Sequence, residues 1–348
     1  MVMKKIMPII MDTSFNKLAI IDDYISFIWT TRYYAAGDFE LCVNVSASNF
    51  NLFKQDYYIY REDDENVGII EDIKIQRNAD GQEIFIVTGR FLSSILARRI
   101  IAVQTTVDGS ISDCIDQLIT ENVIDPSVAA RQIDDFILGD YTISETMQAQ
   151  YTGDNLLETI CKLCETYGIG FKVTLNAQNQ FVFSLYEGVD HTYDQTENPW
   201  VIFSDKYDNL LSSEYEENYQ NISTAVLVAG EGEGLDRITQ WVTKSMTGLN
   251  RREVYKDKRD VRKTEDMTAS AYKNLLKEAG KEALTTYVAA FTGTVYFEGI
   301  AYKDDVNVGD LCVIENSRWG LYLNSRLVEV IESVSESGEY SIVPTFGI

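Results

Sequence analysis

Histidine is nearly absent from this chain of 348 residues, which contains one copy, His191. One histidine cannot supply a zinc site built from several imidazole ligands, and the sequence has no HExxH motif. His191 lies in the polar stretch 191–198, so a position in a surface loop is the simplest interpretation. The sequence therefore predicts no metal site.

Cysteine is also scarce, and five copies are an odd number that argues against a framework of disulfides. Cys161 and Cys164 form a CxxC motif. A redox-active pair needs the N-terminus of a helix, where the thiolate is stabilised, whereas these two lie within a helical pattern. They share its apolar face with Leu156, Ile160 and Tyr167, so we predict that both are small core side chains.

Long apolar runs are missing, and no stretch approaches the roughly 18 apolar residues that span a membrane. In segment 1–11 two lysines precede a short apolar run that Pro8 interrupts, which is too short for the core of a signal peptide. We therefore expect no membrane insertion of this chain, and we expect it to be made and folded in a cytoplasm.

Positive charge is the scarcest property of all, because 30 Lys and Arg residues face 54 Asp and Glu residues, for a net charge of −24. This balance opposes general binding of nucleic acid, since phosphate contacts need Lys and Arg. It suits a surface along which DNA passes without adhering, and it suits simple solubility equally well. Composition leaves both interpretations open.

Catalytic motifs are lacking as well. The sequence has no GxSxG elbow, and its glycine-rich segment 230–234 lacks the Lys-Ser/Thr of a phosphate-binding loop, so a hairpin or flexible loop is predicted there. Carboxylates are abundant, but no pattern selects a pair with the defined separation that a glycosidase requires. We predict a protein without enzymatic activity and without a cofactor.

What the sequence does contain is a strong strand signal in its first 100 residues, from alternation and from β-branched and aromatic content. Strands are predicted at 24–34, 39–45, 57–60, 68–75 and 83–88, and a short helix at 91–97. In the middle, Ser110 and Asp113 resemble a capping box before a helical stripe. Thr152 is predicted to cap a second helix, and strands at 171–175 and 180–185 follow it.

Strands dominate again from Pro199 onward, ending in a meander at 310–314, 321–334 and 340–343. One helix is predicted at about 268–287; its buried stripe would be Tyr272, Leu275, Leu276, Ala279 and Ala283. The predicted fold class is mainly β with an α+β insert. Two related, β-barrel-like domains, 1–105 and 200–348, flank a middle α/β module at 106–199, and the second includes the helix.

The two β regions resemble each other segment by segment. Segment 56–60 matches 310–314, 70–73 matches 328–331, and the ends 88–89 and 346–347 correspond, with offsets of 254 to 258 residues. The alternative, that any two β-meanders look alike at this level, stays open. If the repeat is real, three chains supply six similar units, and closed cyclic symmetry is the usual arrangement of such copies.

Several motifs, each weak alone, together resemble the siphophage tail proteins of the baseplate-hub type, and they run almost from end to end of the chain. They are Gly37–Leu41, Val67–Ile73, Val87–Arg90 with Leu92, Leu96, Arg98, Arg99 and Ile100, then Thr152–Leu157, Tyr167–Gly170, Val308–Asp310, Arg326–Ile331 and Pro344–Gly347. The resemblance implies a structural, homotrimeric hub that closes the tail tube, similar in fold to the hub of contractile tails.

The same resemblance implies a location at the tail tip and a set of partners. These are the last tube ring or a distal tail protein above, the tape measure protein inside, and a spike or tail-tip protein below, with DNA passing through unbound. Because the chain stops at Ile348, where many relatives continue into a host-binding or wall-degrading domain, we expect lytic activity in a separate protein.

An acidic tract covers residues 190–236, with eleven Asp or Glu residues and one basic residue, Lys206. We hypothesise that part of it faces the channel and repels passing DNA. The candidates are Glu214, Glu216, Glu217, Glu231 and Glu233. A solvated outer face is the alternative.

Segment 251–263 is the opposite, with seven basic residues in thirteen. In a strongly acidic assembly, a basic segment can dock a neighbouring acidic subunit. The candidates are Arg251, Arg252, Lys256, Lys258 and Arg259. A solvated loop is the alternative.

Two other functions remain open. The 21 tyrosines and four tryptophans suggest a receptor- or carbohydrate-binding protein of the tail tip, but sugar-binding aromatics must be exposed, and most of these alternate within strands and are expected in the core. A cell-wall hydrolase is the third possibility.

Overall fold

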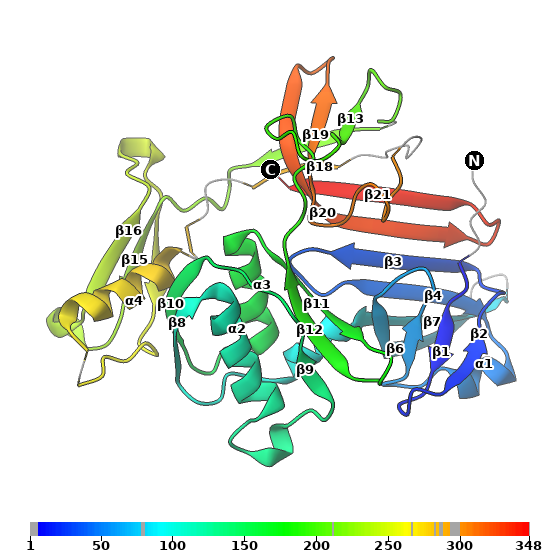
Figure 1. Ribbon diagram of the computed structural model, residues 1–348, viewed down its shortest axis with the longest axis horizontal. Helices are drawn as coiled ribbons and strands as arrows, with labels where there is room; N and C mark the ends of the chain where they lie inside the picture. The colour runs from blue at the N-terminus through cyan, green and yellow to red at the C-terminus, as the bar shows by residue number, and fades with distance from the viewer. Residues whose placement is uncertain are drawn as a thin grey trace.

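The computed structural model describes residues 6–77, 81–210, 212–265, 267–281, 283–284, 288–292 and 300–347. Figure 1 shows the blue N-terminal strands and the red C-terminal strands lying side by side, a helical module below them, and a small sheet with one helix projecting to the left. Within the described residues, no helix has the length and apolar character needed to cross a membrane.

One sheet of 13 strands organises the molecule, in the order β14-β18-β21-β20-β3-β4-β7-β6-β5-β1-β2, with β19 beside β20 and β13 beside β19. From the N-terminal part come β1 (Ile9–Met11), β2 (Lys17–Ile20), β3 (Ser26–Arg32), β4 (Asp38–Asn44), β5 (Tyr58–Tyr60), β6 (Val67–Arg77) and β7 (Glu83–Phe91). From the C-terminal part come β13 (Ile202–Ser204), β14 (Glu214–Asn218), β18 (Val288–Thr292), β19 (Leu311–Asn316), β20 (Leu321–Ser335) and β21 (Tyr340–Gly347).

The two halves of this sheet repeat one topology. In the first β unit, β5, β6 and β7 form an antiparallel meander, β4 pairs with the free side of β7, and β3 pairs with β4. In the second β unit, β19, β20 and β21 form the meander, β18 pairs with β21, and β14 pairs with β18, again all antiparallel. The predicted internal repeat is confirmed.

The repeat extends to the register of the residues. Ile70 pairs with Gly89, and adding 257 to both numbers gives the pair Leu327–Phe346. The same addition converts each pair from Asp72–Thr88 to Arg77–Glu83 into a pair of the second unit. Both meanders also have an irregularity at the same place, directly after Ile70 and after Leu327.

The three sequence matches, 56–60 with 310–314, 70–73 with 328–331 and 88–89 with 346–347, are therefore each wrong by one residue. The β-bulge does not cause this error, because both units have it and the offset of 257 is the same on its two sides. In the first strand of each meander the offset is 253, since Tyr58 pairs with Ile69 and Leu311 with Arg326. The second unit accordingly has four more residues between equivalent positions of these two strands, and they lengthen the strands of the β19–β20 hairpin.

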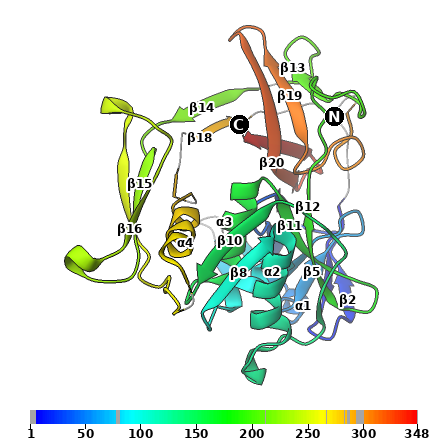
Figure 2. The ribbon, with the colours of Figure 1, turned by 60° about the vertical axis from the view of Figure 1, so that its left-hand side comes forward.

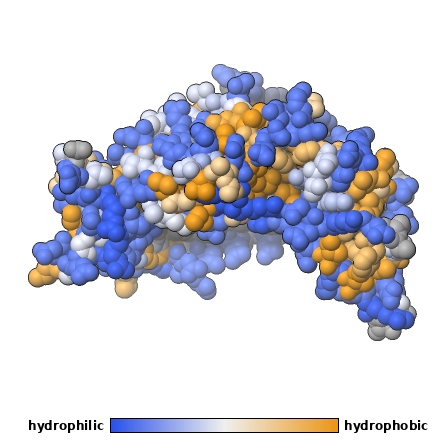
Figure 3. Space-filling model, turned by 90° about the horizontal axis from the view of Figure 1, so that it is seen from below, coloured by the Kyte–Doolittle hydropathy of each residue, from blue (hydrophilic) through white to orange (hydrophobic). Residues whose placement is uncertain are grey.

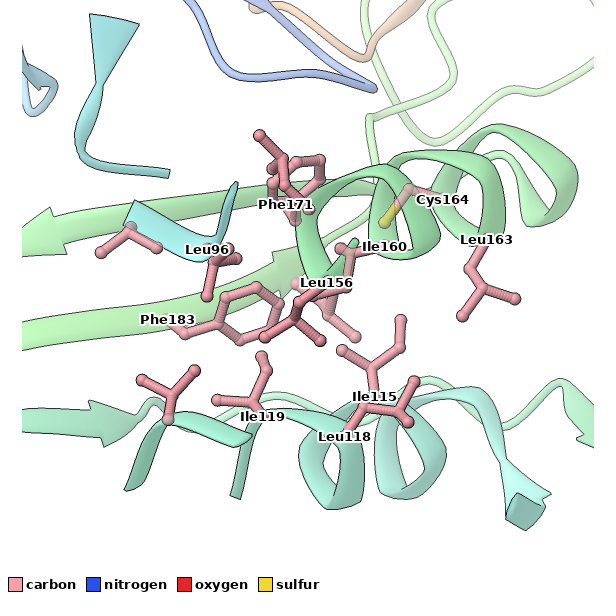
Figure 4. Close-up of a cluster of buried hydrophobic side chains, with 14 of the residues drawn as sticks. Leu96, Ile115, Leu118, Ile119, Leu156, Ile160, Leu163, Cys164, Phe171 and Phe183 are labelled. Carbon is pink, nitrogen blue, oxygen red and sulfur yellow. The ribbon is translucent and has the colours of Figure 1, made fainter. Parts of the chain in front are cut away.

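The middle module packs two helices against small sheets. It comprises β8 (Thr105–Ser110), α2 (Ile111–Ile119), β9 (Phe136–Leu138), β10 (Thr146–Tyr151), α3 (Leu156–Tyr167), β11 (Gly170–Leu175) and β12 (Phe181–Tyr186). Figure 4 shows side chains of α2 and α3 meeting in its core, with Phe171 and Phe183 from the strands and Leu96 from a preceding 3-10 helix, Leu92–Arg98. This buried cluster also contains Val67 and Ile69 of β6, so the module is fixed to the first β unit.

Helix capping confirms one prediction and corrects another. The Ser110 hydroxyl accepts a hydrogen bond from the Asp113 backbone N–H at 3.1 Å, as the capping box predicts. Thr152 does not cap α3, because Gly153 turns the chain at φ +79° and the helix begins later. Asn155 is the cap, and its side chain accepts from the Glu158 N–H at 3.2 Å.

A separate small body lies between β14 and β18 in the sequence, and we call it the insert. It consists of β15 (Ala225–Ala229), β16 (Thr239–Thr243), β17 (Glu253–Asp257) and α4 (Ala269–Lys281), which have a core of their own. The predicted stripe from Tyr272 to Ala279 is buried, and Ala283 packs against it. The sequence predicts that this helix reaches about 287, but it ends at Lys281 and residues 283–284 are not helical, while 285–287 lie outside the described residues.

The prediction of a mainly β fold with two related β units and a middle α/β module is confirmed. The two units are not separate in space, because β3 pairs with β20 and makes their strands one continuous sheet. The domain limits at residues 105 and 199 stay a prediction.

Candidate interaction surfaces

The joint between the two β units contains a buried ion cluster. Arg61, fully buried after β5, donates to both carboxylate oxygens of Glu332 in β20, at 3.0 and 3.1 Å, and to both of Asp63 at 2.7 Å. Lys303 lies 3.1 Å from Glu332 and 2.6 Å from Asp64. The buried charges are thus paired with opposite charges, which is the condition under which burial of ions is tolerated.

Aromatic side chains complete this cluster. The Trp29 indole N–H donates to Asp64 at 3.2 Å, and the Tyr340 hydroxyl donates to Glu332 at 2.6 Å. Burial, with the negative charge of Glu332, raises the pKa of Tyr340. Burial lowers the pKa of Arg61, but its hydrogen bonds to Asp63 and the charge of Glu332 outweigh this, so the net shift is upward.

A pocket of about 420 Å³ lies beside the cluster and is lined by Asp64, Glu65, Lys172, Lys303 and Asp310 among others. Two of its carboxylates are engaged as follows: Lys172 lies 2.6 Å from Glu65, and Asp310 accepts hydrogen bonds from two backbone N–H groups at 2.7 Å. Within the described parts of the chain, no three His, Cys, Asp or Glu residues form a group able to hold a metal ion. The pocket therefore offers neither a free carboxylate pair nor a ligand set.

His191 is buried, which corrects the expectation of a surface-loop residue. Its Nδ1 lies 2.8 Å from the Pro199 carbonyl oxygen, and its Nε2 lies 3.6 Å from Asp310 Oδ2. The surrounding residues are polar because they supply hydrogen bonds, such as the one from Asn198 to the Asp190 carbonyl at 3.1 Å. Residues 193–198 of the same stretch are exposed or half-buried, so the prediction of a surface loop fails for His191 and not for the segment.

The CxxC motif lies within α3, as predicted, with Cys164 buried and Cys161 half-buried. Burial raises the pKa of Cys161 to about 11, and burial also raises the pKa of Cys164. Both thiols are consequently protonated near neutral pH, and the prediction of small core side chains is confirmed.

The acidic candidates do not form one surface. Glu214, Glu216 and Glu217 lie on β14, where alternation directs Glu214 and Glu216 to one face and Glu217 to the other. Glu217 accepts hydrogen bonds from the hydroxyls of Tyr215 and Tyr219, which lower its pKa.

The two remaining candidates, Glu231 and Glu233, lie between β15 and β16 in the insert. Glu231 accepts from the Lys263 N–H at 3.1 Å and from Arg262 at 3.2 Å, and these bonds lower its pKa. Since β15 and β16 pair antiparallel, segment 230–234 belongs to a hairpin connection, as predicted.

The basic candidates lie on and beside β17, and each has a partner within the chain. Arg251 bonds Glu253 at 2.5 Å and lies over the Trp241 ring, and Arg252 donates to the Tyr219 carbonyl oxygen. In the same way, Lys256 donates to the Ala279 carbonyl at 3.0 Å, Lys258 lies 3.1 Å from Asp260, and Arg259 lies 2.9 Å from Asp257.

Three of the four tryptophans are exposed, which corrects the expectation that they lie in the core. Trp200, Trp241 and Trp319 are 55%, 41% and 52% exposed, whereas Trp29 is fully buried. Trp200 stacks edge-on against exposed Tyr193, with ring centroids 5.1 Å apart. Trp200 and Trp319 lie just outside strands and Trp241 faces outward from β16, so alternation gave no information on the first two.

Figure 3 shows one face of the molecule as an arch on which hydrophilic residues predominate, with apolar groups near the middle and at the right-hand end. The right-hand end is the first β unit, and the left-hand end is the insert. Sequence reasoning missed two almost fully exposed leucines of the insert, Leu235 and Leu249, which no periodic pattern marks.

The fold recurs in phage tail proteins whose structures are solved. The tail protein from Neisseria meningitidis is 12% identical, with 99% of this chain and 97% of that chain covered and a TM-score of 0.60. Prophage MuSo2 43 kDa tail protein from Shewanella oneidensis is 13% identical (98% and 98% covered, TM-score 0.58). Prophage tail protein gp18 from Listeria monocytogenes is 14% identical (98% and 94% covered, TM-score 0.54). At these identities the likeness shows a common fold.

The family follows from the sequence itself. Residues 8–348 match the Siphovirus ReqiPepy6 Gp37-like protein family, and the chain belongs to it. A search of curated proteins gives no match. The chain thus belongs to a siphovirus protein family and has the fold of solved phage tail proteins, and the predicted resemblance is confirmed at that level.

Proposed function

We propose that this chain is the hub subunit of a phage tail: three copies form a ring that closes the tail tube and joins it to a spike or tail-tip protein. The observation that carries this proposal is the repeat of one five-strand unit within a single chain, with conserved register. Three copies would present six similar units, which match a sixfold tube on one side and a threefold spike on the other.

The partners follow from that geometry. A tube or distal tail protein would stack on the ring, the tape measure protein would pass through it, and DNA would cross it without specific binding. The open face of the central sheet, opposite the core side chains, carries Glu40, Asp72, Glu214 and Glu216, so it suits a channel that repels DNA. The basic residues of β17 would dock an acidic neighbour, exchanging their internal partners for external ones.

The proposed hub has no catalytic role. In the pocket of about 420 Å³, Asp64, Glu65 and Asp310 are paired or hydrogen-bonded, as a structural site requires. A receptor- or carbohydrate-binding role is the second candidate, because Trp200 and Trp319 expose the flat apolar rings that sugars stack against. A glycan array that gives a specific signal, abolished by Trp200→Ala, would favour this second role.

The mass of the purified chain tests the proposed ring. One copy has a mass of 39.5 kDa, so light scattering or native mass spectrometry should give three times this value at high protein concentration. Electron microscopy of the same sample should show a ring with an open centre. A monomer at all concentrations contradicts the proposal.

A further inference from the structure

The structure assigns a partner to the acidic edge strand: we propose that β14 of one copy pairs antiparallel with residues 72–77 of β6 in the next copy. This inference rests on the proposed ring and adds its intersubunit register. It starts from the joint that the chain already makes between its own two units, where β3 pairs with β20. In that joint the first strand of one unit meets the middle meander strand of the other.

The strand β14 is the counterpart of β3. Trp29 pairs with Phe39, which pairs with Gly89, and Tyr215 pairs with Phe291, which pairs with Phe346. Gly89 and Phe346 are equivalent in the repeat, so Trp29 and Tyr215 are equivalent as well. Adding 186 to a residue number therefore converts β3 into β14.

The strand β6 is likewise the counterpart of β20, by an offset of 257. In β20, residues 321–326 pair with β19 and residues 329–335 pair with β3. In β6, residues 67–69 pair with β5, but the equivalent stretch 72–77 has no partner strand on that side among the described residues. Five of its six residues are exposed, including Ile75 at 45%.

Within the described part of the chain, β14 and residues 72–77 of β6 thus have no partner strand on the sides where their counterparts, β3 and β20, pair with each other. Among the strands that the structure describes, β14 is the last of the sheet on its side, and Figure 2 shows it leading toward the insert. Applying the two offsets to the pair Thr30–Ile331 gives Glu216 opposite Lys74. The neighbouring pair, Trp29–Glu332, gives Tyr215 opposite Ile75.

The chemistry of these derived pairs is complementary. Glu216 and Lys74 are exposed and have opposite charges, and within the described residues neither takes part in an ion pair. Tyr215 is half-buried against the core of its own unit, so Ile75 would extend that core across the boundary. Opposite charges and an aromatic–aliphatic pair are favourable cross-strand neighbours. The partner of β14 is therefore the stretch 72–77 of β6 in a second copy of this chain, and the partner of that stretch is the β14 strand of another copy.

A disulfide trap tests the register. The Tyr33 N–H donates to the Val328 carbonyl at 2.9 Å, which makes the pair Thr30–Ile331 a non-hydrogen-bonded one. Such pairs have Cα atoms about 4.5 Å apart, within the range that a disulfide bridges. The full-length variant K74C/E216C should therefore form covalent dimers and trimers under mild oxidation. Seven strand steps at roughly 4.8 Å separate β6 from β14 within one chain, so a link inside one copy is excluded.

The controls isolate the register and the direction. In I75C/E216C the pairing is shifted by one residue, which places the two thiols on opposite faces, so linking should fall at least tenfold. A mixture of K74C and E216C single variants should stop at dimers. Wild-type protein measures any background from the native cysteines, none of which is fully exposed.

The outcomes separate this inference from the proposed function. Covalent trimers from K74C/E216C and none from I75C/E216C support the pairing. A wild-type trimer by light scattering with no K74C/E216C link overturns the pairing and leaves the ring intact. A monomeric wild type whose K74C/E216C variant also fails to link overturns both.

Discussion

The two β units share strand order and register, yet their first strands, β3 and β14, differ in whether a strand of the same chain pairs with their outer side. β3 is covered by β20 and carries buried Phe27 and Trp29. Among the described strands β14 pairs with β18 alone, and it carries exposed Glu214 and Glu216. The shared strand order determines which edges can pair with another strand, and the side chains at each edge determine which strand pairs there. The following predictions test this difference, in order of decreasing effect.

Breaking the buried ion cluster at the joint between β3 and β20 should cause the largest loss of folding stability. Glu332→Ala leaves the buried Arg61 without its partner in β20, and breaking a buried pair costs about 3–5 kcal/mol. Denaturant unfolding should show this loss of stability. Glu71→Ala removes the exposed pair with Arg90 and should cost below about 1 kcal/mol. Equal losses from both variants would contradict the assigned role of the joint.

The equivalent aromatic residues Trp29 and Tyr215 should also differ in how much their removal lowers the free energy of unfolding. Trp29→Ala empties a fully buried site and should cost about 3–5 kcal/mol in the free chain. Its counterpart Tyr215 is half-buried, so Tyr215→Ala should cost clearly less in the monomer. If β14 is covered in the ring, the same variant should weaken trimers as well. Thermal unfolding and dilution measured by light scattering separate these two effects.

A pH profile distinguishes another equivalent pair, Tyr33 and Tyr219. Burial raises the pKa of Tyr33 to about 12, and its hydroxyl donates to the Gly168 carbonyl at 3.1 Å. The folded state therefore favours the neutral phenol more than the unfolded state does. This stabilisation is complete below pH 10 and is lost as the pH rises toward 12, by about 2 kcal/mol.

Unfolding midpoints measured between pH 9 and pH 11.5 should fall in the wild type and fall less steeply in Tyr33→Phe, where other buried phenols such as Tyr340 still contribute. Tyr219 is 47% exposed, so Tyr219→Phe should keep the wild-type profile. A shallower fall in Tyr219→Phe and an unchanged one in Tyr33→Phe would contradict the assignment of this pH dependence to Tyr33.

The smallest expected effect is electrostatic. Lys74→Glu would place like charges opposite Glu216 and weaken each contact by about 0.2–1 kcal/mol, so the trimer should dissociate at higher protein concentration. Glu216→Lys should do the same, and the double exchange should restore assembly. Added salt should reduce both effects, since exposed charges are screened. Failure of the double exchange to restore assembly would refute direct contact between the two side chains.

Much of the fold could be predicted because its signals are local. Alternation marks the strands, and a helical stripe from Tyr272 to Ala279 marks α4. The predictions failed where a signal depends on three-dimensional context. The two units were matched one residue out of register, because the strand pairs that define the register are not visible in the sequence. Asn155 rather than Thr152 is the cap because the chain turns at Gly153.

The candidate surfaces were less predictable for the same reason. Runs of charge suggested two sets of sites, but the acidic residues are divided between β14 and the insert, and Arg251 and Arg259 already have internal partners. The open stretch of β6 reads in the sequence as an ordinary strand. It becomes visible as a contact site only when the structure shows that its counterpart in β20 is covered.

The glutamates of β14 have one more consequence, for the direction of growth. Two copies that met through the same edge, β14 against β14, would bring carboxylate against carboxylate along a five-residue strand with three glutamates. Such a head-to-head dimer is self-repelling, so its formation is disfavoured near neutral pH. A newly made subunit therefore does not pair through β14 with the same strand of a second copy, and its β14 remains available for head-to-tail assembly.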